Sequence, residues 1–491
     1  MEVGTIISIE PPSTSKFYFS IKKGCNVRKG EYVKVEMQKG VLVAIVEEVF
    51  KSNKYFSNPE YLSEANNFGI NLEEKYPVDR WEYLIGEAYP LGIFENGLEK
   101  RVDTVPSPGA KVFLADESLI ESFFGLDKNG IEIGELELHN IKVKLNLTRL
   151  FKKHLAVLGI SGSGKSHFVS VLIEEILKRD KSPAVIVIDP HGEYVSFSQD
   201  ERFSHKTKIW SKENISFATH NIGVNSFSEL IPEMSGAQLR DLSRVIEEMK
   251  DKKIYTIDDL IKKIEESEDI KKIVRETLIS WLSDLNSTKL FSEKDSPNID
   301  ELARIGELSV IDLSSFVNLK EKQIITTRIA RMLFEGRRKN KIPPFILIVE
   351  EAHQFAPEKR EEMAISKNVI EQIAREGRKF FASLVLVSQR PVRLSTTALS
   401  QCNTQVIFRV TNPYDLRHIG ETSEKITEEI VKMISGLKVG EAFIIGEATN
   451  SPLMVKVRRK SVKELKDRKL EEMIEEFLKE KREHVDFFFT T

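Results

Sequence analysis

The first hundred residues alternate short apolar runs with polar, glycine- or proline-containing breaks. Four of these runs, GTIISIE, FYFSIK, YVKVEM and GVLVAIVEEVF, are rich in β-branched and aromatic residues. Their composition and close spacing are typical of strands in a small barrel or sandwich. After a helical gap at about residues 59–75, strand-like runs resume at WEYLIGEAYPLGIF and continue to IEIGELEL. The pattern predicts a small β-barrel domain over residues 1–148.

From about residue 150, apolar strands alternate with helical stretches, which is the pattern of a parallel α/β sheet. The strand candidates are HLAVLG, AVIVID, LSVIDL, FILIVE, ASLVLVS, TQVIFRV and EAFIIG. Between about residues 226 and 300 the chain is charged, and its apolar residues recur at helical spacing. We expect a first core segment at 149–225, a helical insertion at 226–304, a second core segment at 305–460 and a C-terminal helical brace at 461–491.

The composition of the 491-residue chain is that of a globular protein with several domains. The formal net charge is −3, so any site for a polyanion must be local. Two cysteines, Cys25 and Cys402, are too few for a disulfide framework, which suits a reducing compartment. The apolar runs are far shorter than the roughly 20 residues that a membrane span needs. We therefore expect a soluble, cytoplasmic protein without a membrane partner.

A glycine-rich segment between a strand and a helix carries the clearest chemistry. In HLAVLGISGSGKSHFVSVLIEEIL, four residues fit the pattern GxxxxGK[ST]. The glycines let the main chain wrap an anion, the helix start offers free N–H groups, the lysine reaches the β- and γ-phosphates, and the serine can bind Mg²⁺. The sequence thus predicts an ATP site. Its expected residues are Gly159, Ile160, Ser161, Gly162, Ser163, Gly164, Lys165, Ser166 and His167.

Two further strands end in acids that can complete such a site. The run VIVID ends at Asp189 and leads into a Pro-His-Gly turn, whereas PPFILIV is followed by Glu350 and Glu351. Adjacent acids at a strand end point in different directions, so one can face a metal and the other the attacking water. We assign Mg²⁺ to Ser166 and Glu350, the water-activating base to Glu351, and an additional acid near the γ-phosphate to Asp189. From the residues alone, an ordinary strand-to-turn junction fits Asp189 equally well.

The order of these motifs resembles the HerA branch of the HerA/FtsK DNA-translocase superfamily. The matching elements stand here as GISGSGKS, DPHGEY, ILIVEEAHQF and LVLVSQRP, followed by LSQCNTQVIFRVTNPYDLRHI and LKVGEAFIIGEA. The resemblance covers about residues 150–460 and implies an α/β P-loop NTPase core of the RecA-like (ASCE) type with a helical insertion. The N-terminal segment is similar to the small HAS-barrel-like domain that precedes the motor in that family. The resemblance also implies that DPHGEY belongs to the ATP site. Glu350 stands where many P-loop ATPases have aspartate.

Two further side chains, an amide and one arginine, are expected to act on the nucleotide. Gln389 ends the run LVLVSQ, where a neutral amide can hydrogen-bond both the attacking water and a γ-phosphate oxygen. The resemblance implies an arginine finger near IAREGRKF, and Arg375 and Arg378 are its candidates. For contacts to DNA phosphates, we consider Arg393 and the lysines of TKIWSKEN, Lys208 and Lys212. A solvated surface position fits each of these last three residues equally well.

The resemblance implies an ATP hydrolase that works as a DNA-dependent ATPase and helicase or translocase. Its expected partners are double-stranded DNA, further copies of itself in a homohexamer, and a docked nuclease of the NurA type for end resection and repair. ATP and Mg²⁺ are the expected cofactors. The alternatives are a HerA-like ATPase of a bacterial antiphage defence complex, a VirB4-type secretion ATPase, and an assembly scaffold stabilised by nucleotide. The sequence shows no nuclease constellation of its own, so any cutting is expected of the partner.

Overall fold

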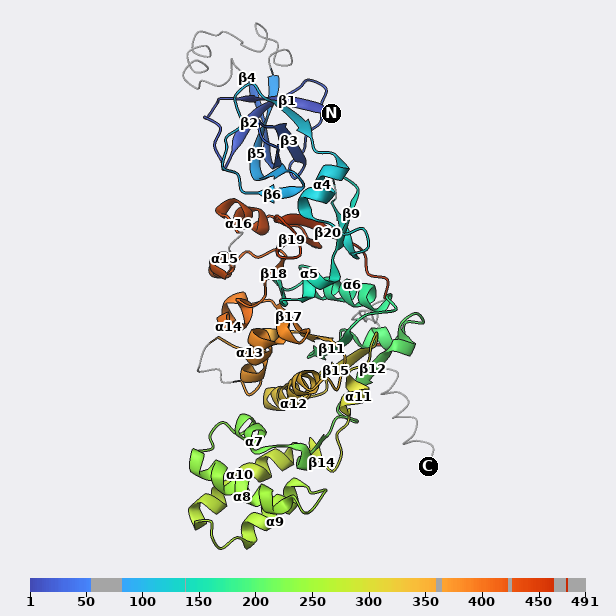
Figure 1. Ribbon diagram of the computed structural model, residues 1–491, viewed down its shortest axis with the longest axis vertical. Coiled ribbons are helices and arrows are strands. Elements are labelled where there is room, and N and C mark those ends of the chain that lie inside the picture. Colours follow the sequence, from blue (N-terminus) through green and yellow to red (C-terminus); the bar gives the residue numbers. More distant parts are fainter. Residues whose placement is uncertain (54–81, 137, 359–363, 423–425, 463–473, 476–491) are drawn as a thin grey trace. The chain divides into compact units, whose positions relative to one another are not determined.

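The computed structural model describes residues 1–53, 82–136, 138–358, 364–422, 426–462 and 474–475 (Figure 1). The chain divides into two compact units, which are described separately. Unit 1 comprises Met1–Lys165, Glu351–Met363 and Ile370–Arg458, and unit 2 comprises Ser166–Glu350, Ala364–Val369 and Arg459–Thr491. The helical gap predicted at 59–75 lies outside the described residues, and so does the predicted brace apart from residues 461–462 and 474–475.

Unit 1 begins with a closed antiparallel sheet, drawn in blue in Figure 1. The strands follow the order β2-β1-β7-β3-β4-β5-β6, and pairing of β2 with β5 closes the first six into a barrel. Alternate side chains of β2, such as Phe17 and Phe19, are fully buried in its core, as expected for one face of a pleated strand. The strands are β1 (Glu2–Ile7), β2 (Phe17–Ile21), β3 (Tyr32–Glu36), β4 (Val41–Asn53), β5 (Glu82–Glu95), β6 (Leu98–Lys100) and β7 (Lys111–Leu114).

The rest of unit 1 forms a mixed α/β layer. Its strands run in the order β17-β10-β18-β19-β20-β8-β9, with β10 parallel to β17 and β18 and antiparallel pairs from β18 onward. The strands are β8 (Ile131–Leu136), β9 (Ile141–Leu145), β10 (Leu155–Leu158), β17 (Ala382–Ser388), β18 (Thr404–Ile407), β19 (Glu441–Gly446) and β20 (Leu453–Val457). The helices are α4 (Glu117–Phe124), α5 (Leu147–Phe151), most of α13 (Lys367–Glu376), α14 (Thr396–Leu399), α15 (Pro413–Thr422) and α16 (Glu428–Ser435).

Unit 2 contains four parallel strands in the order β12-β15-β11-β16. Every residue of β11 and of β16 is buried, which explains why both read as unbroken apolar runs. The strands are β11 (Ala184–Asp189), β12 (Thr207–Trp210), β15 (Leu308–Asp312), β16 (Phe345–Val349) and the separate pair β13 (Phe217–Ala218) and β14 (Phe291–Ser292). The helices are α6 (Lys165–Leu177), α7 (Val224–Leu230), α8 (Gly236–Met249), α9 (Ile257–Glu266), α10 (Lys272–Ser287), α11 (Ile299–Leu302) and α12 (Leu319–Arg338). The short 3₁₀ helices of unit 2 are η1 (Val195–Gln199), η2 (Ser204–Lys206) and η3 (Thr219–Asn221), and those of unit 1 are η4 (Ala352–Gln354), η5 (Gly377–Lys379) and η6 (Pro391–Arg393).

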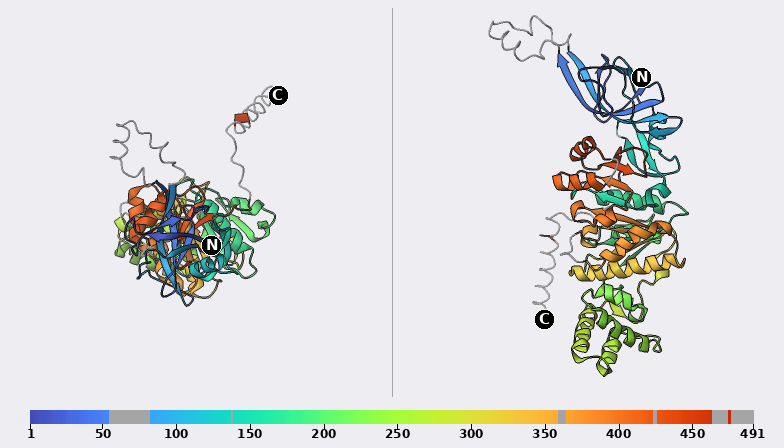
Figure 2. Two further views of the ribbon diagram at one scale, coloured as in Figure 1. Left: turned by 90° about the horizontal axis from the view of Figure 1, so that it is seen from above. Right: turned by 60° about the vertical axis from the view of Figure 1, so that its left-hand side comes forward.

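Helices α8, α9 and α10 pack on one another within unit 2 and appear in green in Figure 2. Capping boxes fix the starts of α8 and α9, because the side chains of Ser235 and Thr256 accept main-chain N–H groups of the first turn. Each helix buries one apolar stripe, as Leu260 and Ile264 show in α9. The charged residues between these stripes face solvent, which accounts for the polar character of the segment.

All seven strands predicted after residue 150 are present, as β10, β11 and β15–β19. The sequence pattern missed β12 and β20, and also the two-residue strands β13 and β14. All four residues of β12 are only half-buried, and β20 mixes buried with exposed positions. Neither strand therefore carries the continuous apolar run that identified the others.

Candidate active-site residues

The glycine-rich loop of unit 1 follows the fully buried strand β10 and leads into α6. Gly159 has φ +154°, and a Cβ there would lie 2.6 Å from Cβ of Phe408. Ser163 Oγ donates a hydrogen bond of 2.7 Å to the Ile160 carbonyl, and Lys165 Nζ donates one of 2.9 Å to the same oxygen. The ammonium group of Lys165, a residue that is 9% exposed, thus lies against the main chain of its own loop. A loop of this kind can cradle a phosphate, and the binding role given to its residues stays a prediction.

The remaining predicted phosphate-binding residues, Ser166 and His167, lie in unit 2 at the start of α6. Nε2 of His167 accepts the main-chain N–H of Lys460 at 3.2 Å. Both side chains are half-buried. His167 therefore joins the first turn of α6 to the segment after β20.

Asp189, also in unit 2, shapes its own loop. Its Oδ1 accepts the main-chain N–H groups of His191 and Gly192 at 3.2 and 2.9 Å, and its Oδ2 accepts that of Tyr194 at 2.9 Å. Burial raises the pKa of Asp189, and these N–H groups oppose that shift. Both carboxylate oxygens thus stabilise the main-chain turn of the segment DPHGEY. The catalytic role given to Asp189 stays a prediction.

Glu350 follows β16 in unit 2 and is 6% exposed. The hydroxyl of Tyr194 donates a hydrogen bond to its Oε1. Tyr194 is fully buried, and this burial, with the nearby charge of Glu350, holds the pKa of Tyr194 well above its usual value. The loop that Asp189 stabilises thus positions the Tyr194 hydroxyl, which orients the Glu350 carboxylate. Sequence reasoning missed Tyr194, although it is the last residue of the DPHGEY motif.

Glu351 belongs to unit 1 and adopts a left-handed conformation with φ 49° and ψ 42°. Such a conformation is uncommon for a residue other than glycine and costs roughly 1–3 kcal/mol. Nδ1 of His353 lies 3.3 Å from Glu351 Oε2 and 3.3 Å from Oγ of Ser388. Ser388 Oγ also accepts the main-chain N–H of Arg390 at 3.0 Å. The predicted base is therefore linked to the end of β17 through two residues, His353 and Ser388, that sequence reasoning missed.

The other predicted side chains lie at or near the ends of β17. Gln389 directly follows the strand and is half-buried. Arg375, on α13, is exposed and lies 3.6 Å from the carboxylate of Glu371. Arg378 is exposed in η5, and no ion pair to it is present among the residues that the structure describes. The two finger candidates thus differ in whether their charge is already paired.

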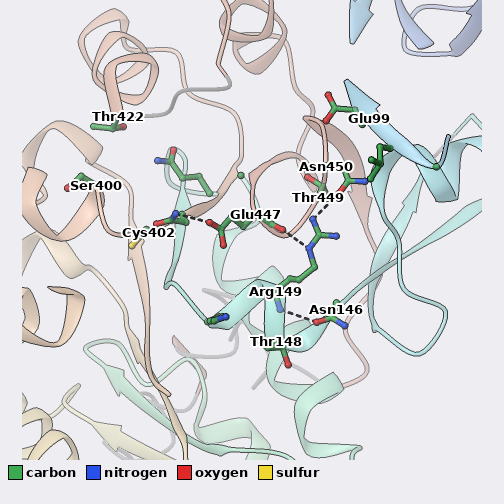
Figure 3. Close-up of a pocket in the computed structure, with 16 residues that line it drawn as sticks. Glu99, Asn146, Thr148, Arg149, Ser400, Cys402, Thr422, Glu447, Thr449 and Asn450 are labelled. Atoms are coloured by element: carbon green, nitrogen blue, oxygen red, sulfur yellow. Dashed lines mark hydrogen bonds between the residues drawn. The ribbon is translucent and has the colours of Figure 1, made fainter. Parts of the chain in front are cut away.

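A polar pocket of about 850 Å³ in unit 1 contains none of the predicted site residues (Figure 3). Arg149 is its central charged group. It donates from Nε to the Glu447 carbonyl at 2.9 Å and from Nη2 to the side-chain oxygen of Asn450 at 3.0 Å. The labelled residues of Figure 3 show this arginine pointing to the loop that holds Glu447 and Asn450. The hydrogen bonds of Arg149 thus stabilise the loop that holds Glu447 and Asn450.

Three comparisons place the chain among known proteins. A family model described as "Helicase HerA, central domain" matches residues 131–333. The "DNA double-strand break repair helicase HerA" of Pyrococcus furiosus is 30% identical over an alignment of 517 residues including gaps. This alignment covers 91% of this chain and 90% of that protein. VirB4 of Thermoanaerobacter pseudethanolicus has a similar fold, with a TM-score of 0.56, 14% identity and coverage of 68% of this chain and 98% of that one. The plasmid coupling protein TrwB with the ATP analogue ADPNP has a TM-score of 0.51, with 12% identity and coverage of 72% and 94%.

A glycine-rich phosphate loop between a buried strand and a helix, with acids at the ends of two other buried strands, defines a P-loop NTPase. The chain belongs to the HerA family. The predicted fold class, a P-loop core with a small N-terminal barrel and a helical insertion, is confirmed. The protein is an ATP-hydrolysing enzyme. Among the described residues, no helix combines the length and apolarity that crossing a bilayer requires.

Proposed function

We propose that the protein is an ATP-driven translocase and helicase on double-stranded DNA that works as a homohexameric ring. We further propose that it acts with a partner nuclease of the NurA type in end resection and repair. The observation that carries this proposal is the alignment, over 91% of the chain, with a relative named as a DNA double-strand break repair helicase. The ordered motifs from the glycine-rich loop to Gln389 support the same activity.

In this proposal the loop from Gly159 to His167 holds the phosphates of ATP, and Lys165 neutralises the β- and γ-phosphates. Ser166 and Glu350 supply oxygen ligands of the kind that Mg²⁺ prefers, and the Tyr194 hydroxyl keeps the Glu350 carboxylate in one orientation. These donors fit the ion. Bound Mg²⁺ would offset the charge that develops on the transferred phosphate. Asp189 contributes by folding the loop that carries Tyr194.

Glu351 is the proposed general base that takes a proton from the attacking water. Its left-handed conformation turns it away from the direction that a continued strand would give, and Nδ1 of His353 lies 3.3 Å from its Oε2. Gln389 is the proposed phosphate sensor, because its amide can both donate to a phosphate oxygen and accept from water. His353, which lies next to the proposed base, contacts Ser388 at the end of β17, and the proposed sensor Gln389 is the next residue. A displacement of either the base or the sensor is therefore expected to move the other.

Of the two finger candidates, the structure favours Arg378, because Arg375 is already paired with Glu371. A finger must reach a phosphate on another subunit with its charge available. Of the candidates for DNA contact, Arg393 is exposed, whereas Lys208 lies 3.9 Å from Glu307 and Lys212 lies over the ring of Phe316. Arg393 is therefore the best of the three for sequence-independent phosphate contact.

The test is a measurement of ATPase rate with and without duplex DNA, combined with native mass spectrometry. Duplex DNA is expected to raise the rate severalfold, and this stimulation should weaken with added salt, as counterion release requires. Arg393→Gln should reduce the stimulation, whereas Arg244→Gln, an exposed arginine of the insertion that lies near Asp241, should leave it unchanged. A monomeric mass together with an ATPase rate that is the same with and without duplex DNA would overturn the proposal and favour a secretion-type ATPase.

The same preparation distinguishes repair from antiphage defence. A NurA-type nuclease added to the ring should bind it and degrade duplex ends only when ATP is hydrolysed. The matched control is the Glu351→Gln ring, which should bind the nuclease without supporting degradation. Failure of such a nuclease to bind the assembled ring would reject this partner while leaving the translocase assignment intact.

A further inference from the structure

A pocket of about 660 Å³ lies within unit 2, where the start of the helical insertion meets α12. Three segments line it: residues 221–226 around the start of α7, residues 295–299 before and at α11, and the half of α12 that begins at residue 328, with the turn after it. None of the residues assigned a role in ATP hydrolysis lines this pocket. Its charged groups therefore need a separate explanation.

Arg328, which lines the pocket, is only 4% exposed. Its Nε is buried without a hydrogen-bond partner, and within the part of the chain that the structure describes no ion pair to its guanidinium is present. The group rests over the ring of Phe217, with Cζ 5.7 Å from the ring centroid. Burial lowers the pKa of Arg328, but a guanidinium stays charged at neutral pH. A buried cation without an anion is costly, because its lost hydration is not replaced.

Two of the nearby carboxylates, Asp295 and Glu229, are engaged by other donors. Asp295 accepts the Ala218 N–H at 2.8 Å on Oδ1 and the Asn221 side-chain amide at 2.6 Å on Oδ2. Glu229 pairs with Arg331 on the same helix as Arg328. Glu335 is exposed at the rim.

The rim adds further positive charge. Lys339 and Lys341 are exposed and also line the pocket. With Arg331 paired with Glu229, the lining carries three further cations, Arg328, Lys339 and Lys341, against the two carboxylates of Asp295 and Glu335.

We propose that this pocket binds a small soluble phosphate compound, either inorganic phosphate or the phosphate of a nucleotide, on the guanidinium of Arg328. The planar fork of an arginine matches two phosphate oxygens, and a bound dianion would supply the direct hydrogen-bond and ion-pair partner that Arg328 lacks. Arg328 is only 4% exposed and thus lies too deep for the phosphates of a rigid duplex, which favours a small compound over DNA. The exposed Lys339 and Lys341 then attract the phosphate at the entrance of the pocket.

The experiment compares melting temperatures in phosphate and in chloride at equal ionic strength. It uses the full chain with Lys165→Ala, so that the ATP loop loses its main phosphate ligand. Phosphate is expected to raise the melting temperature by roughly 1–3 °C in this background. Adding Arg328→Met should abolish the rise and leave the protein at least as stable in chloride, because the unpaired buried charge is gone. A merely structural Arg328 would instead give a loss of stability that is equal in both salts.

The matched control is Arg338→Met, also on α12, where the guanidinium lies 5.7 Å from the Phe334 ring but is exposed and outside the pocket lining. This variant should keep the full phosphate response. Should Arg328→Met fail to fold, Lys339→Gln with Lys341→Gln should still raise the phosphate concentration needed for half the response severalfold. Replacing phosphate by AMP distinguishes the two sources, because a nucleotide site responds at lower concentrations of AMP than of phosphate.

Three outcomes would overturn the proposal. One is a phosphate response that is the same with and without Arg328→Met. Another is the absence of any response in the Lys165→Ala background. The third is a loss of duplex-DNA affinity in Arg328→Met without any phosphate effect, which would assign Arg328 to DNA.

Discussion

At the scale of single residues, the two adjacent acids after β16 have different main-chain conformations and different partners. Glu350 accepts a hydrogen bond from the Tyr194 hydroxyl, whereas Glu351 adopts the left-handed conformation and lies near His353. We expect Glu351→Gln to bind ATP normally while kcat falls by roughly 10²-fold or more, because the shape is kept and the base is lost. Single-turnover hydrolysis and nucleotide affinity measure the two effects. Loss of turnover in Glu350→Gln with an active Glu351→Gln would reverse the two roles.

Lys165 holds the charge of the phosphate loop against the Ile160 carbonyl. Lys165→Ala is expected to abolish measurable ATP binding, because the main chain alone cannot balance the β- and γ-phosphate charges. Fluorescent nucleotide titration measures the affinity, and the exposed Lys438→Ala in the same unit is the control. Near-normal affinity in Lys165→Ala would reject the assignment of the loop.

His353 contacts Glu351 through Nδ1, so its effect on turnover should come from positioning. His353→Ala is expected to lower kcat by roughly 10–100-fold with little change in the KM for ATP. His353→Asn should recover part of the rate, because its side-chain amide can donate near the position of Nδ1. An equal loss in both variants would show that the ring fills space and does not orient the base.

At the scale of elements, His154 joins the start of β10 to two neighbouring segments of unit 1. Its Nδ1 accepts the Leu384 N–H at 3.0 Å, so its Nε2 carries the proton that is donated to the Ala374 carbonyl at 2.9 Å. Burial lowers the pKa of His154 from 6.5 to about 4, and the charge of Arg378 adds to this shift. Protonation of Nδ1 would break the bond from Leu384.

Because the folded pKa lies below the unfolded one, the unfolded chain binds more protons between these two values. The contribution of His154 is complete above pH 6.5 and is lost as the pH falls toward 4. The shift corresponds to about 3 kcal/mol. We expect the melting temperature to fall on acidification through this window, and His154→Asn should flatten that dependence. An unchanged slope in the variant would assign the acid sensitivity to other groups.

The elements also show how far the sequence could predict the site. The strands β10, β11 and β16 were predictable because a strand buried on both faces must be apolar throughout, and the phosphate loop follows from glycines at fixed spacing. The contact of Tyr194 with Glu350 joins residues 156 positions apart, and that of His353 with Ser388 joins residues 35 apart. No local pattern encodes such pairs, since they depend on which strands become neighbours in the sheet. The sequence supplied the acids but not the residues that orient them.

At the scale of the whole molecule, the proposed ring requires one subunit to complete the ATP site of another. Arg378→Ala is expected to lower kcat by roughly 10³-fold while ATP binding and assembly persist, because the guanidinium acts on charge that develops in the transition state. Arg378→Lys should not rescue the rate, since an ammonium cannot copy the planar fork. Arg375→Ala, which removes an arginine near Glu371, is the matched control and should retain most activity.

Mixed assemblies test whether the arginine acts between subunits. Lys165→Ala subunits keep Arg378 but bind no nucleotide, and Arg378→Ala subunits bind nucleotide but lack the finger. Each should be inactive alone. Mixing them before assembly should restore part of the ATPase rate, because some intact phosphate loops then face an intact arginine on the neighbour. The recovery should follow the mixing ratio and vanish when both substitutions are placed in the same chain. A mixture as inactive as its components, with native masses that show mixed rings, would place the arginine in the same subunit as the loop it serves.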